Sequence, residues 1–283
     1  MNYNSAYARS IADQLEAAIT AQTIDVPVLP DATHKVLALT QDPDSDALQL
    51  ANILQSEPTL SGHVICIANS AAYSAASNIV SLQQAITRLG MVEISNIAIA
   101  VSLNNKLFKA LGYEQHVDAI WQHALLTALW SKEVARKQRK NVEAAFLCGL
   151  LHSIGKIVIL QTIADFRASQ ESIMGDYDLT VLFSQFQRDV SEVITDSWSL
   201  PSIIAEAVTF HHHFDDAPNH SDVAAAVMFS RQIATHTTDE TQLSDEALRQ
   251  SPALRLLNFY PDDIDELLAL VPKINEDVKA LAL

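Results

Sequence analysis

Glycine is scarce in this chain, and that scarcity limits its fold more than any other feature. Only six glycines occur among 283 residues, whereas globular proteins average about 7% glycine. The chain is rich in Ala, Leu and Ile, aromatic residues make up 6% of it, and no stretch shows convincing strand alternation. Alanine and leucine favour helices, and glycine opposes them. The sequence therefore predicts an all-α protein.

Apolar residues recur at helical spacing along most of the chain. Between residues 3 and 20 they fall on one face. Residues 92–107 are apolar on nearly every face, and such a helix is stable in water only when other helices enclose it. We therefore expect this segment at the centre of an N-terminal bundle. Further helices are expected at about 31–39, 47–55, 58–70, 85–89, 117–138, 142–152, 157–170, 178–197, 201–213, 222–236 and 262–281.

The chain is strongly acidic, with a formal net charge of −16 and a pI of about 4.8. A nucleic-acid-binding protein needs a basic surface that neutralises phosphates. The 18 Lys and Arg residues, against 34 Asp and Glu, leave little for such a surface. We expect no nucleic-acid partner. Cys66 and Cys148 lie in apolar helical segments and are expected to be reduced core residues.

No segment has the features of a targeting sequence or a membrane span. Residues 1–25 contain one arginine and no apolar core, so no signal peptide is predicted. The most apolar stretch, residues 146–160, is interrupted by His152 and Lys156 and is too short to cross a bilayer. The sequence thus predicts a cytoplasmic protein without a membrane partner.

The chain is long enough for one large domain or two smaller ones. We expect residues 1–23 to form an N-terminal helix, residues 24–115 a first helical bundle and residues 116–283 a second. The segment Val26-Pro27-Val28-Leu29-Pro30 is an expected extended connector, because each proline disfavours the α conformation of the residue before it.

Short motifs follow one another in order along residues 24–215. The first part contains Leu29-Pro30, Asp42-Pro43-Asp44, Leu50-Ala51, Glu57-Pro58-x-Leu60, Ala68-Asn69-Ser70 with Tyr73, Ser81-Leu82-x-x-Ala85-Ile86 and Leu89-Gly90. The second contains Gly149-Leu150-Leu151-His152-x-x-Gly155-Lys156, Trp198-x-Leu200-Pro201 and His211-His212. In this order and spacing, the chain resembles the HDOD family, the HD-related output domains of bacterial signalling proteins. The resemblance implies two packed helical bundles, of which the C-terminal one is like an HD-type phosphohydrolase.

The resemblance also implies a set of candidate metal ligands. In catalytic HD proteins, histidines and aspartates from several helices hold one or two metal ions, and a metal-bound water attacks phosphorus. His123, His152 and the pair His211-His212 stand at the positions of the family's histidines. They form a possible remnant metal site.

The residues expected to complete that site differ from the family pattern. Ser153 replaces the aspartate that follows the histidine, and Gln187 stands where related domains often carry another histidine. Ser230-Arg231 stand where a final aspartate is expected. A serine hydroxyl is a poor substitute for an anionic ligand on a hard cation, and an arginine repels a cation. The HD-like half is therefore predicted to be degenerate.

Each candidate residue has a structural interpretation beside the functional one. The histidines are either hydrogen-bonded core residues or weak ligands of a transition metal such as Zn²⁺ or Ni²⁺. We expect no cofactor, and at most weak binding of a divalent transition metal. Lys156 is either a phosphate contact or a solvated lysine past a helix end. Asn69 and Ser70 either cap a helix C-terminus or shape a groove between the bundles.

Three functions remain open from the sequence. The favoured one is a non-catalytic signal-transduction or regulatory module that binds a signalling protein partner or a small ligand. The alternative is a metal-dependent phosphohydrolase of the HD type, acting on nucleotides or cyclic dinucleotides. The third is a helical scaffold without a ligand pocket. The missing carboxylates favour the first.

Overall fold

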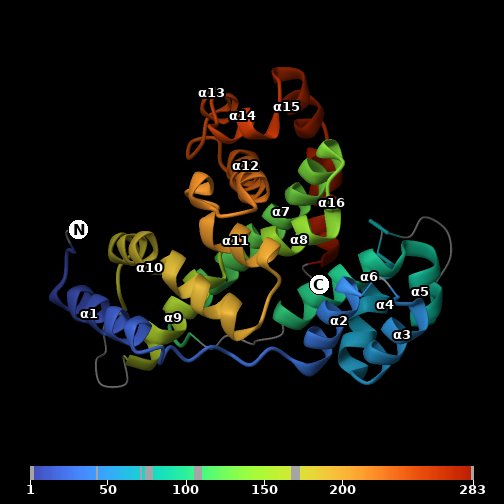
Figure 1. Ribbon diagram of the computed structural model, residues 1–283, viewed down its shortest axis with the longest axis horizontal. Coiled ribbons are helices and arrows are strands. Elements are labelled where there is room, and N and C mark those ends of the chain that lie inside the picture. Colours follow the sequence, from blue (N-terminus) through green and yellow to red (C-terminus); the bar gives the residue numbers. More distant parts are fainter. Residues whose placement is uncertain are drawn as a thin grey trace. The chain divides into compact units, whose positions relative to one another are not determined.

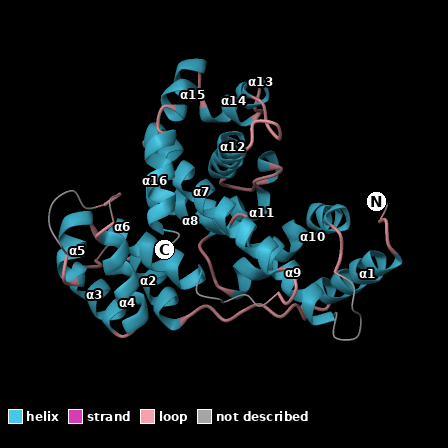
Figure 2. Ribbon diagram, turned by 180° about the vertical axis from the view of Figure 1, so that it is seen from behind, coloured by secondary structure: helices cyan, strands magenta, loops and turns pink. Residues whose placement is uncertain are grey.

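The computed structural model describes residues 3–42, 44–70, 72–73, 79–104, 110–166 and 173–281. Within these ranges the regular elements are helices and no strand occurs, as Figures 1 and 2 show. The predicted all-α fold is confirmed. The chain divides into two compact units. Unit 1 consists of Met1–Pro27 and Phe108–Pro261, and unit 2 of Val28–Leu107 and Asp262–Leu283.

Unit 2 is built around α6 (Met91–Asn104). Ile94, Ile97 and Ile99 of this helix are at most 1% exposed, and α6 packs against α2, α3, α4, α5 and α16. The predicted central helix is therefore confirmed over its described part, and residues 105–107 lie outside the described residues. The other helices that contribute to unit 2 are α2 (Asp31–Gln41), α3 (Ala47–Gln55), α4 (Pro58–Ala68), α5 (Leu82–Leu89), α15 (Pro261–Leu268) and α16 (Val271–Leu281).

Unit 1 is built around the 25-residue helix α7 (Glu114–Gln138). This helix packs against α8 (Val142–Leu151) and α12 (Ser221–Thr238). Trp130, at its centre, is fully buried. The other elements of unit 1 are α1 (Ala6–Thr20), α9 (Ile154–Phe166), α10 (Asp176–Ser197), α11 (Ser202–Phe210), the 3-10 helix η1 (Phe214–Asp216), α13 (Asp245–Arg249) and α14 (Ala253–Leu257). Helix α9 packs on α10, and α11 packs on α8, α10 and α12.

Two glycines let the helices of unit 1 approach one another closely. A Cβ atom on Gly149 of α8 would lie 2.6 Å from the Cα of Ala128 in α7. A Cβ atom on Gly155 of α9 would lie 2.6 Å from the carbonyl oxygen of Gln187 in α10. Carbon atoms cannot approach backbone atoms so closely, because favourable contacts begin at about 3.5 Å. The turn between α8 and α9 is therefore held close to both α7 and α10.

The N-terminal helix α1 belongs to unit 1 because a buried carboxylate attaches it to α10. Asp178, which is 5% exposed, accepts hydrogen bonds from the Asn4 backbone N–H at 2.7 Å and the Ser5 hydroxyl at 2.8 Å. Ser5 in turn caps α1 by accepting a hydrogen bond from the Ala8 N–H at 3.0 Å. One side chain thus links the start of the chain to the middle of unit 1.

The observed units differ from the predicted boundaries of 1–23, 24–115 and 116–283. Residues 1–27 group with unit 1, and residues 262–283 group with unit 2. Ile274 of α16 is 1% exposed, and α16 packs against α6. The C-terminal helix therefore completes the core of unit 2 rather than that of the HD-like bundle.

The predicted helix at 262–281 is two helices, α15 and α16. Pro272 lies in the first turn of α16, where its missing N–H costs nothing. Further inside a continuous helix its ring would clash with the carbonyl of the preceding turn, so the helix breaks there. The short helices α13 and α14 were not predicted.

One stretch, Val142–Phe166, is long and apolar enough to cross a membrane by length and composition alone. Its most apolar window has a mean hydropathy of 1.7, and 83% of that window is buried inside the protein. The stretch consists of two helices, α8 and α9, with His152 and Ser153 in the turn between them. It forms core helices of unit 1.

Candidate functional site

Four histidines from three segments meet in unit 1. His123 lies on α7, His152 directly follows α8, and His211 and His212 directly follow α11. The ring centroids of His123 and His152 are 5.8 Å apart, those of His152 and His211 are 5.3 Å apart, and those of His211 and His212 are 4.2 Å apart. The fold thus brings together the four histidines singled out in the sequence. We refer to them as the histidine cluster.

Both ring nitrogens of His152 are already hydrogen-bonded. Its Nδ1 lies 2.7 Å from the carbonyl oxygen of Gly149, which can only accept, so Nδ1 carries the proton. Its Nε2 is then unprotonated and carries a lone pair. The Ser153 hydroxyl lies 2.8 Å from Nε2 and donates a hydrogen bond to it. His152 is completely buried. The residue that replaces the expected aspartate therefore occupies the lone pair that a metal ion would need.

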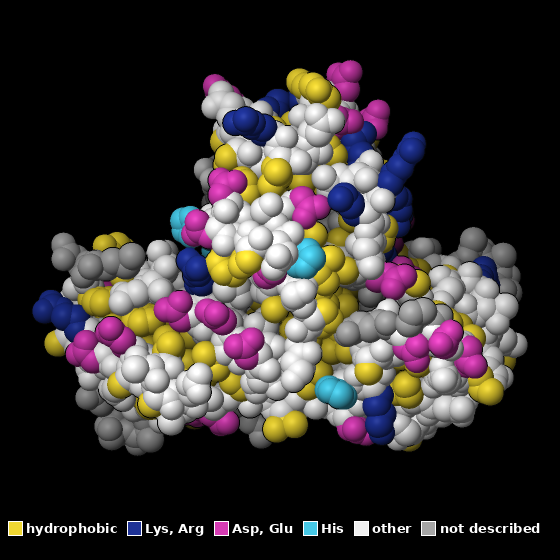
Figure 3. All heavy atoms as spheres, viewed as in Figure 1, with side chains coloured by type: hydrophobic (Ala, Val, Ile, Leu, Met, Phe, Trp, Pro, Cys, Tyr) yellow, Lys and Arg dark blue, Asp and Glu magenta, His cyan; other side chains and the backbone are white. Residues whose placement is uncertain are grey.

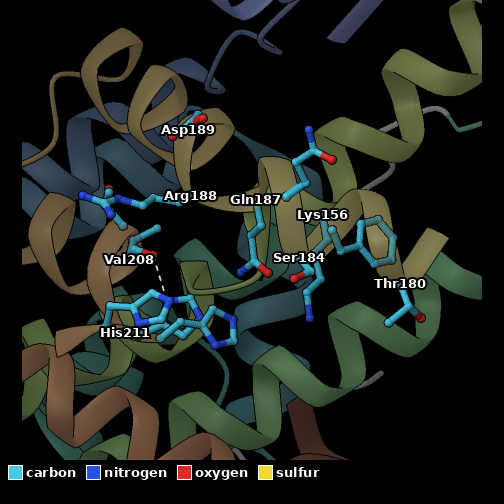
Figure 4. Close-up of a pocket in the computed structure, with 13 residues that line it drawn as sticks. Lys156, Thr180, Ser184, Gln187, Arg188, Asp189, Val208 and His211 are labelled. Carbon is cyan, nitrogen blue, oxygen red and sulfur yellow. Dashed lines mark hydrogen bonds between the residues drawn. The ribbon is translucent and has the colours of Figure 1, made fainter. Parts of the chain in front are cut away.

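His123 and His211 differ in how far their nitrogens are satisfied. His123 Nε2 lies 3.1 Å from the Thr235 hydroxyl, which itself donates to the Arg231 carbonyl at 3.0 Å, so the ring is the donor. His211 Nδ1 donates to the Val208 carbonyl at 2.9 Å (Figure 4). His211 Nε2 is buried and has no hydrogen-bond partner among the described residues. The cluster therefore contains one buried acceptor without a donor.

The other residues at expected ligand positions also bond to the backbone. Gln187 is buried, and its Nε2 donates to the carbonyl oxygen of His152 at 2.9 Å. Ser230 is fully buried, and its hydroxyl donates to the Ala226 carbonyl one turn earlier in α12 at 2.7 Å. Neither side chain supplies an anionic oxygen to the cluster.

Two cations act on the cluster from different helices. Arg231 lies on α12 and Lys156 on α9. Burial, and then the charge of Arg231, lowers the pKa of Lys156 to about 8. Burial likewise lowers the pKa of Arg231, whose Nε is buried without a hydrogen-bond partner among the described residues. The Lys156 ammonium lies 5.9 Å from the centroid of the Phe183 ring.

The histidines of the cluster are held in their neutral form. Burial, and then the neighbouring histidines, lowers the pKa values of His152 and His211 well below the usual range. Burial, and then Arg231 and Lys156, lowers the pKa of His123 to about 4. The pKa of His212 is lowered by the same causes, although this residue is exposed enough for water to screen part of the effect.

The residues present do not fit a hard divalent cation. His152 has no free lone pair, Arg231 places a positive charge beside the cluster, and the expected aspartate positions carry no carboxylate. Within the part of the chain that the structure describes, no group of three or more His, Cys, Asp or Glu side chains is arranged to hold a metal. A hard divalent cation requires anionic oxygen ligands, and this site offers none.

A pocket of about 550 Å³ opens beside the cluster. Its lining residues come from α9, α10, α11 and the turn after α11; they are Lys156, Thr180, Phe183, Ser184, Gln185, Gln187, Arg188, Asp189, Val208, Thr209 and His211 to His213. Figure 4 shows Gln187 pointing toward the histidine rings, whereas Asp189, the carboxylate of the lining, lies away from them. Arg188 is paired with Asp216 at 3.8 Å and lies 4.5 Å from the centroid of the Phe210 ring.

Several residues of this pocket were not predicted from the sequence. The wall formed by α10 uses Thr180, Phe183, Ser184 and Arg188 in addition to Gln187, which the sequence had singled out. Their spacing of three and four residues is that of one helical face, and this spacing is the signal that could have identified them. No spacing pattern in the sequence predicts the hydrogen bond between His123 and Thr235, because α7 and α12 are far apart in the sequence.

Asn69 and Ser70 belong to unit 2, whereas the histidine cluster belongs to unit 1. The Asn69 side chain accepts from the Ile79 N–H at 2.7 Å and donates to the Ile79 carbonyl at 2.7 Å. It also donates to the Ile65 carbonyl at 3.0 Å. Asn69 therefore ties the end of α4 to the segment before α5. The Ser70 hydroxyl is buried without a hydrogen-bond partner in the described residues.

Acid is expected to destabilise the protein as pH falls from about 6.5 to about 4. An unfolded histidine titrates near pH 6.5, whereas the folded cluster stays neutral, so the folded state binds fewer protons in this window and loses stability as pH falls. His123, with its pKa of about 4, should account for about 2 kcal/mol at pH 5. Urea unfolding at pH 7.5 and pH 5 measures the loss. A His123→Gln variant should lose less stability than the wild type between pH 7.5 and pH 5. An equal loss in both proteins would show that His123 does not contribute to the pH dependence.

Solved structures with this fold cover nearly the whole chain. An HDOD domain protein with unknown function from Geobacter sulfurreducens has a TM-score of 0.75 and 20% identity, covering 96% of this chain and 97% of its own. A candidate metal-dependent phosphohydrolase from Shewanella amazonensis SB2B has a TM-score of 0.73 and 21% identity, covering 98% and 100%. A candidate signal transduction protein from Marinobacter aquaeolei VT8 has a TM-score of 0.72 and 20% identity, covering 100% and 68%. At these identities the likeness shows the fold alone.

A curated relative and a family model complete the comparison. An uncharacterized protein of Treponema pallidum (strain Nichols) is 19% identical over 237 residues, which are 81% of this chain and 46% of the relative. The chain thus spans about half the length of the curated relative that it matches. The family model of the HDOD domain matches residues 26–214, more than half of the chain. The chain therefore belongs to the HDOD domain family.

Proposed function

We propose that this protein is a non-catalytic regulatory module of bacterial signal transduction, which acts by binding a small ligand or a signalling protein partner. Its membership of the HDOD family supports a signalling role. The proposal that the module is non-catalytic depends on one observation, the hydrogen bond from Ser153 to His152. This bond takes up the imidazole lone pair of the central histidine, and an HD-type hydrolase needs that lone pair for its metal.

The rest of the site also opposes hydrolysis. Metal-assisted phosphoester cleavage needs a cation that lowers the pKa of a bound water and neutralises charge on the phosphate. Arg231 brings a fixed positive charge to the cluster instead. Lys156 can attract a phosphate but cannot generate the nucleophile. Two structural neighbours are described as candidate phosphohydrolases, which makes hydrolysis the rival function to test.

The surface charge supports a partner other than nucleic acid. Figure 3 shows acidic side chains spread over the face in view, between isolated lysine and arginine side chains. With a net charge of −16, the protein would repel a phosphate backbone. We propose that the module acts in the cytoplasm, without a membrane partner.

The protein is expected neither to retain metal nor to hydrolyse phosphoesters. After purification without chelator or added metal, elemental analysis should find far less than one equivalent of Fe, Mn, Ni or Zn. Turnover of nitrophenyl phosphate esters, nucleotides and cyclic dinucleotides should stay at background, even with added Mn²⁺ or Ni²⁺. The reason is that Ser153 and Arg231 stand where anionic ligands are needed.

Two variants make this test decisive. Ser153→Asp restores one carboxylate but should not restore activity, because Arg231 still stands at the other expected ligand position. His152→Ala removes the central imidazole and is the matched control. Metal-dependent hydrolysis by the wild type that disappears in His152→Ala would identify the protein as an enzyme and overturn the proposal.

A further inference from the structure

A second pocket in unit 1, of about 240 Å³, lies at the C-terminal end of α7. Its other walls come from the first residues of α8, α11 and α12 and the residues just before them. The histidine cluster lies elsewhere, because His123 precedes the pocket residue Gln138 by fifteen positions on α7, or about 22 Å along the helix. The pocket is therefore a separate site.

The apolar part of the lining consists of small aliphatic side chains. They are Ala135, Ala144, Ala145, Ile203, Val223 and Ala226. Ala144, Ile203 and Val223 are only half-buried, so a ligand can reach them. At about 30 Å³ per water molecule, the pocket has room for roughly eight waters, or for a ligand with a similar number of non-hydrogen atoms. A short branched aliphatic group fits this space, and a nucleotide is too large for it.

A cation and an anion share the polar part of the lining. Lys140 Nζ lies 3.2 Å from Asp222 Oδ2, and the two side chains are 58% and 38% exposed. The ammonium group has three donors and the carboxylate two oxygens, so each retains hydrogen-bonding capacity beyond this pair. An exposed ion pair contributes little to stability. Both charges can therefore bind a ligand at little cost.

Two neutral side chains add a donor and an acceptor to the same lining. Asn141 Oδ1 caps α8 by accepting from the Ala144 N–H at 2.9 Å, and its Nδ2 has no partner among the described residues. Gln138 Nε2 donates to the Leu257 carbonyl at 3.4 Å, and its Oε1 has no partner within the described ranges. The pocket thus offers one charged and one neutral donor, and one charged and one neutral acceptor.

Hydrogen bonds fix the backbone on both sides of the pocket. Glu206, which is 9% exposed, accepts from the backbone and side-chain N–H groups of Asn219 and from the His220 N–H at 2.8–2.9 Å. These bonds hold the segment that leads into α12. Arg139 has a φ of 58°, and the Lys140 N–H donates back into α7 at 2.9 Å, as in a Schellman motif. A pocket with fixed walls loses little entropy on binding.

We propose that this pocket binds a free amino acid with a short aliphatic side chain, such as leucine, isoleucine or valine. Lys140 and Asn141 bind its α-carboxylate. Asp222 and Gln138 bind its α-ammonium group, and the aliphatic lining encloses its side chain. A ligand with one charge would attract one member of the ion pair and repel the other, whereas a zwitterion complements both. The inference goes beyond the proposed function and stands whether or not the histidine cluster is catalytic.

Titration calorimetry of the full chain with leucine, glycine, N-acetyl-leucine and leucinamide tests this proposal. Leucine should bind with a Kd of about 1 mM or tighter. Glycine lacks the aliphatic group, N-acetyl-leucine lacks the ammonium charge and leucinamide lacks the carboxylate. Each should therefore bind about tenfold more weakly or worse. Absence of leucine binding at about 10 mM, or equal affinities for leucine and glycine, would rule the proposal out.

Matched variants assign the contacts. Lys140→Gln should weaken leucine binding by about tenfold and remove the preference for leucine over leucinamide. Asp222→Asn should weaken it similarly and remove the preference for leucine over N-acetyl-leucine. Ala144→Leu fills the pocket and should abolish leucine binding. Arg249→Gln breaks the ion pair with Asp245, at 2.7 Å elsewhere in unit 1, and should leave the Kd for leucine within about twofold.

Thermal melting checks that each variant is folded. Wild-type affinity for leucine in both Lys140→Gln and Asp222→Asn would refute the charge contacts. An unchanged Kd in folded Ala144→Leu would refute the location of the site. Neither result depends on phosphoester hydrolysis, so failure of this inference leaves the proposed non-catalytic function standing.

Discussion

Replacing Ile97 by aspartate is expected to unfold unit 2. Ile97 is 1% exposed on α6, the helix against which α2, α3, α4, α5 and α16 pack. An aspartate there would place an unpaired carboxylate in an apolar core, at a cost of about 3–5 kcal/mol, and would lose about 2 kcal/mol of apolar burial. Domains are stable by only about 5–15 kcal/mol. Circular dichroism during heating should show early loss of part of the helical signal.

The same helix supplies the control for this experiment. Val92 is 37% exposed on α6, so Val92→Asp introduces the same charge where water can solvate it. This variant should change stability by less than about 1 kcal/mol. Ile97→Val keeps the core apolar and should cost about 1 kcal/mol. A wild-type melting temperature for Ile97→Asp would show that α6 is not enclosed.

Replacing Gly149 by valine is expected to force α8 away from α7. A Cβ atom at this position would lie 2.6 Å from the Ala128 Cα, a backbone atom that cannot rotate away, and 2.6 Å from the Ser131 hydroxyl oxygen. The free energy of unfolding is expected to fall by about 3 kcal/mol or more. Because the Gly149 carbonyl also accepts from His152, the histidine cluster should lose its geometry as well. Urea unfolding measures the loss.

A substitution at Gly62 provides a control that is expected to stabilise the protein rather than destabilise it. It lies inside α4, and a Cβ atom there would meet nothing within 4 Å. Gly62→Ala should stabilise the protein by about 0.5–1 kcal/mol, because alanine loses less backbone entropy than glycine in a helix. Equal stability changes in Gly149→Val and Gly62→Ala would show that the close packing of α7 and α8 does not matter.

Helix positions were largely predictable because their signals are local. The segments that form α3 and α10, for example, show apolar residues at helical spacing, and α10 has Asp176 and Asp178 in its first turn. Asp46 and Gln49 form a complete capping box before α3. The predicted helices differ from the observed ones where the local signal is weak, as in α13 and α14. They differ also at Pro272, where one predicted helix is two. A five-residue helix has too few apolar positions to establish a period.

The grouping of helices into units was less predictable. The attachment of α1 to α10 depends on Asp178, whose partners Asn4 and Ser5 lie more than 170 positions earlier. The packing of α16 against α6 likewise joins helices that lie far apart in the sequence. Pairings of this kind leave no periodic pattern, because each depends on shape and charge matching between distant surfaces.

The sequence by itself determined that this protein is all-α, that the apolar segment beginning at residue 92 forms a central helix, and that four histidines stand at motif positions whose expected carboxylates are missing. These properties follow from composition, from apolar spacing and from the types of residue at motif positions. Only the tertiary structure decided what the histidines do. Whether a ring nitrogen is free depends on its neighbours in space: Ser153 occupies the lone pair of His152, Thr235 bonds His123, and His211 keeps an unpartnered nitrogen. The same holds for Arg231 and Lys156, because the effect of a charge depends on the groups that surround it in space.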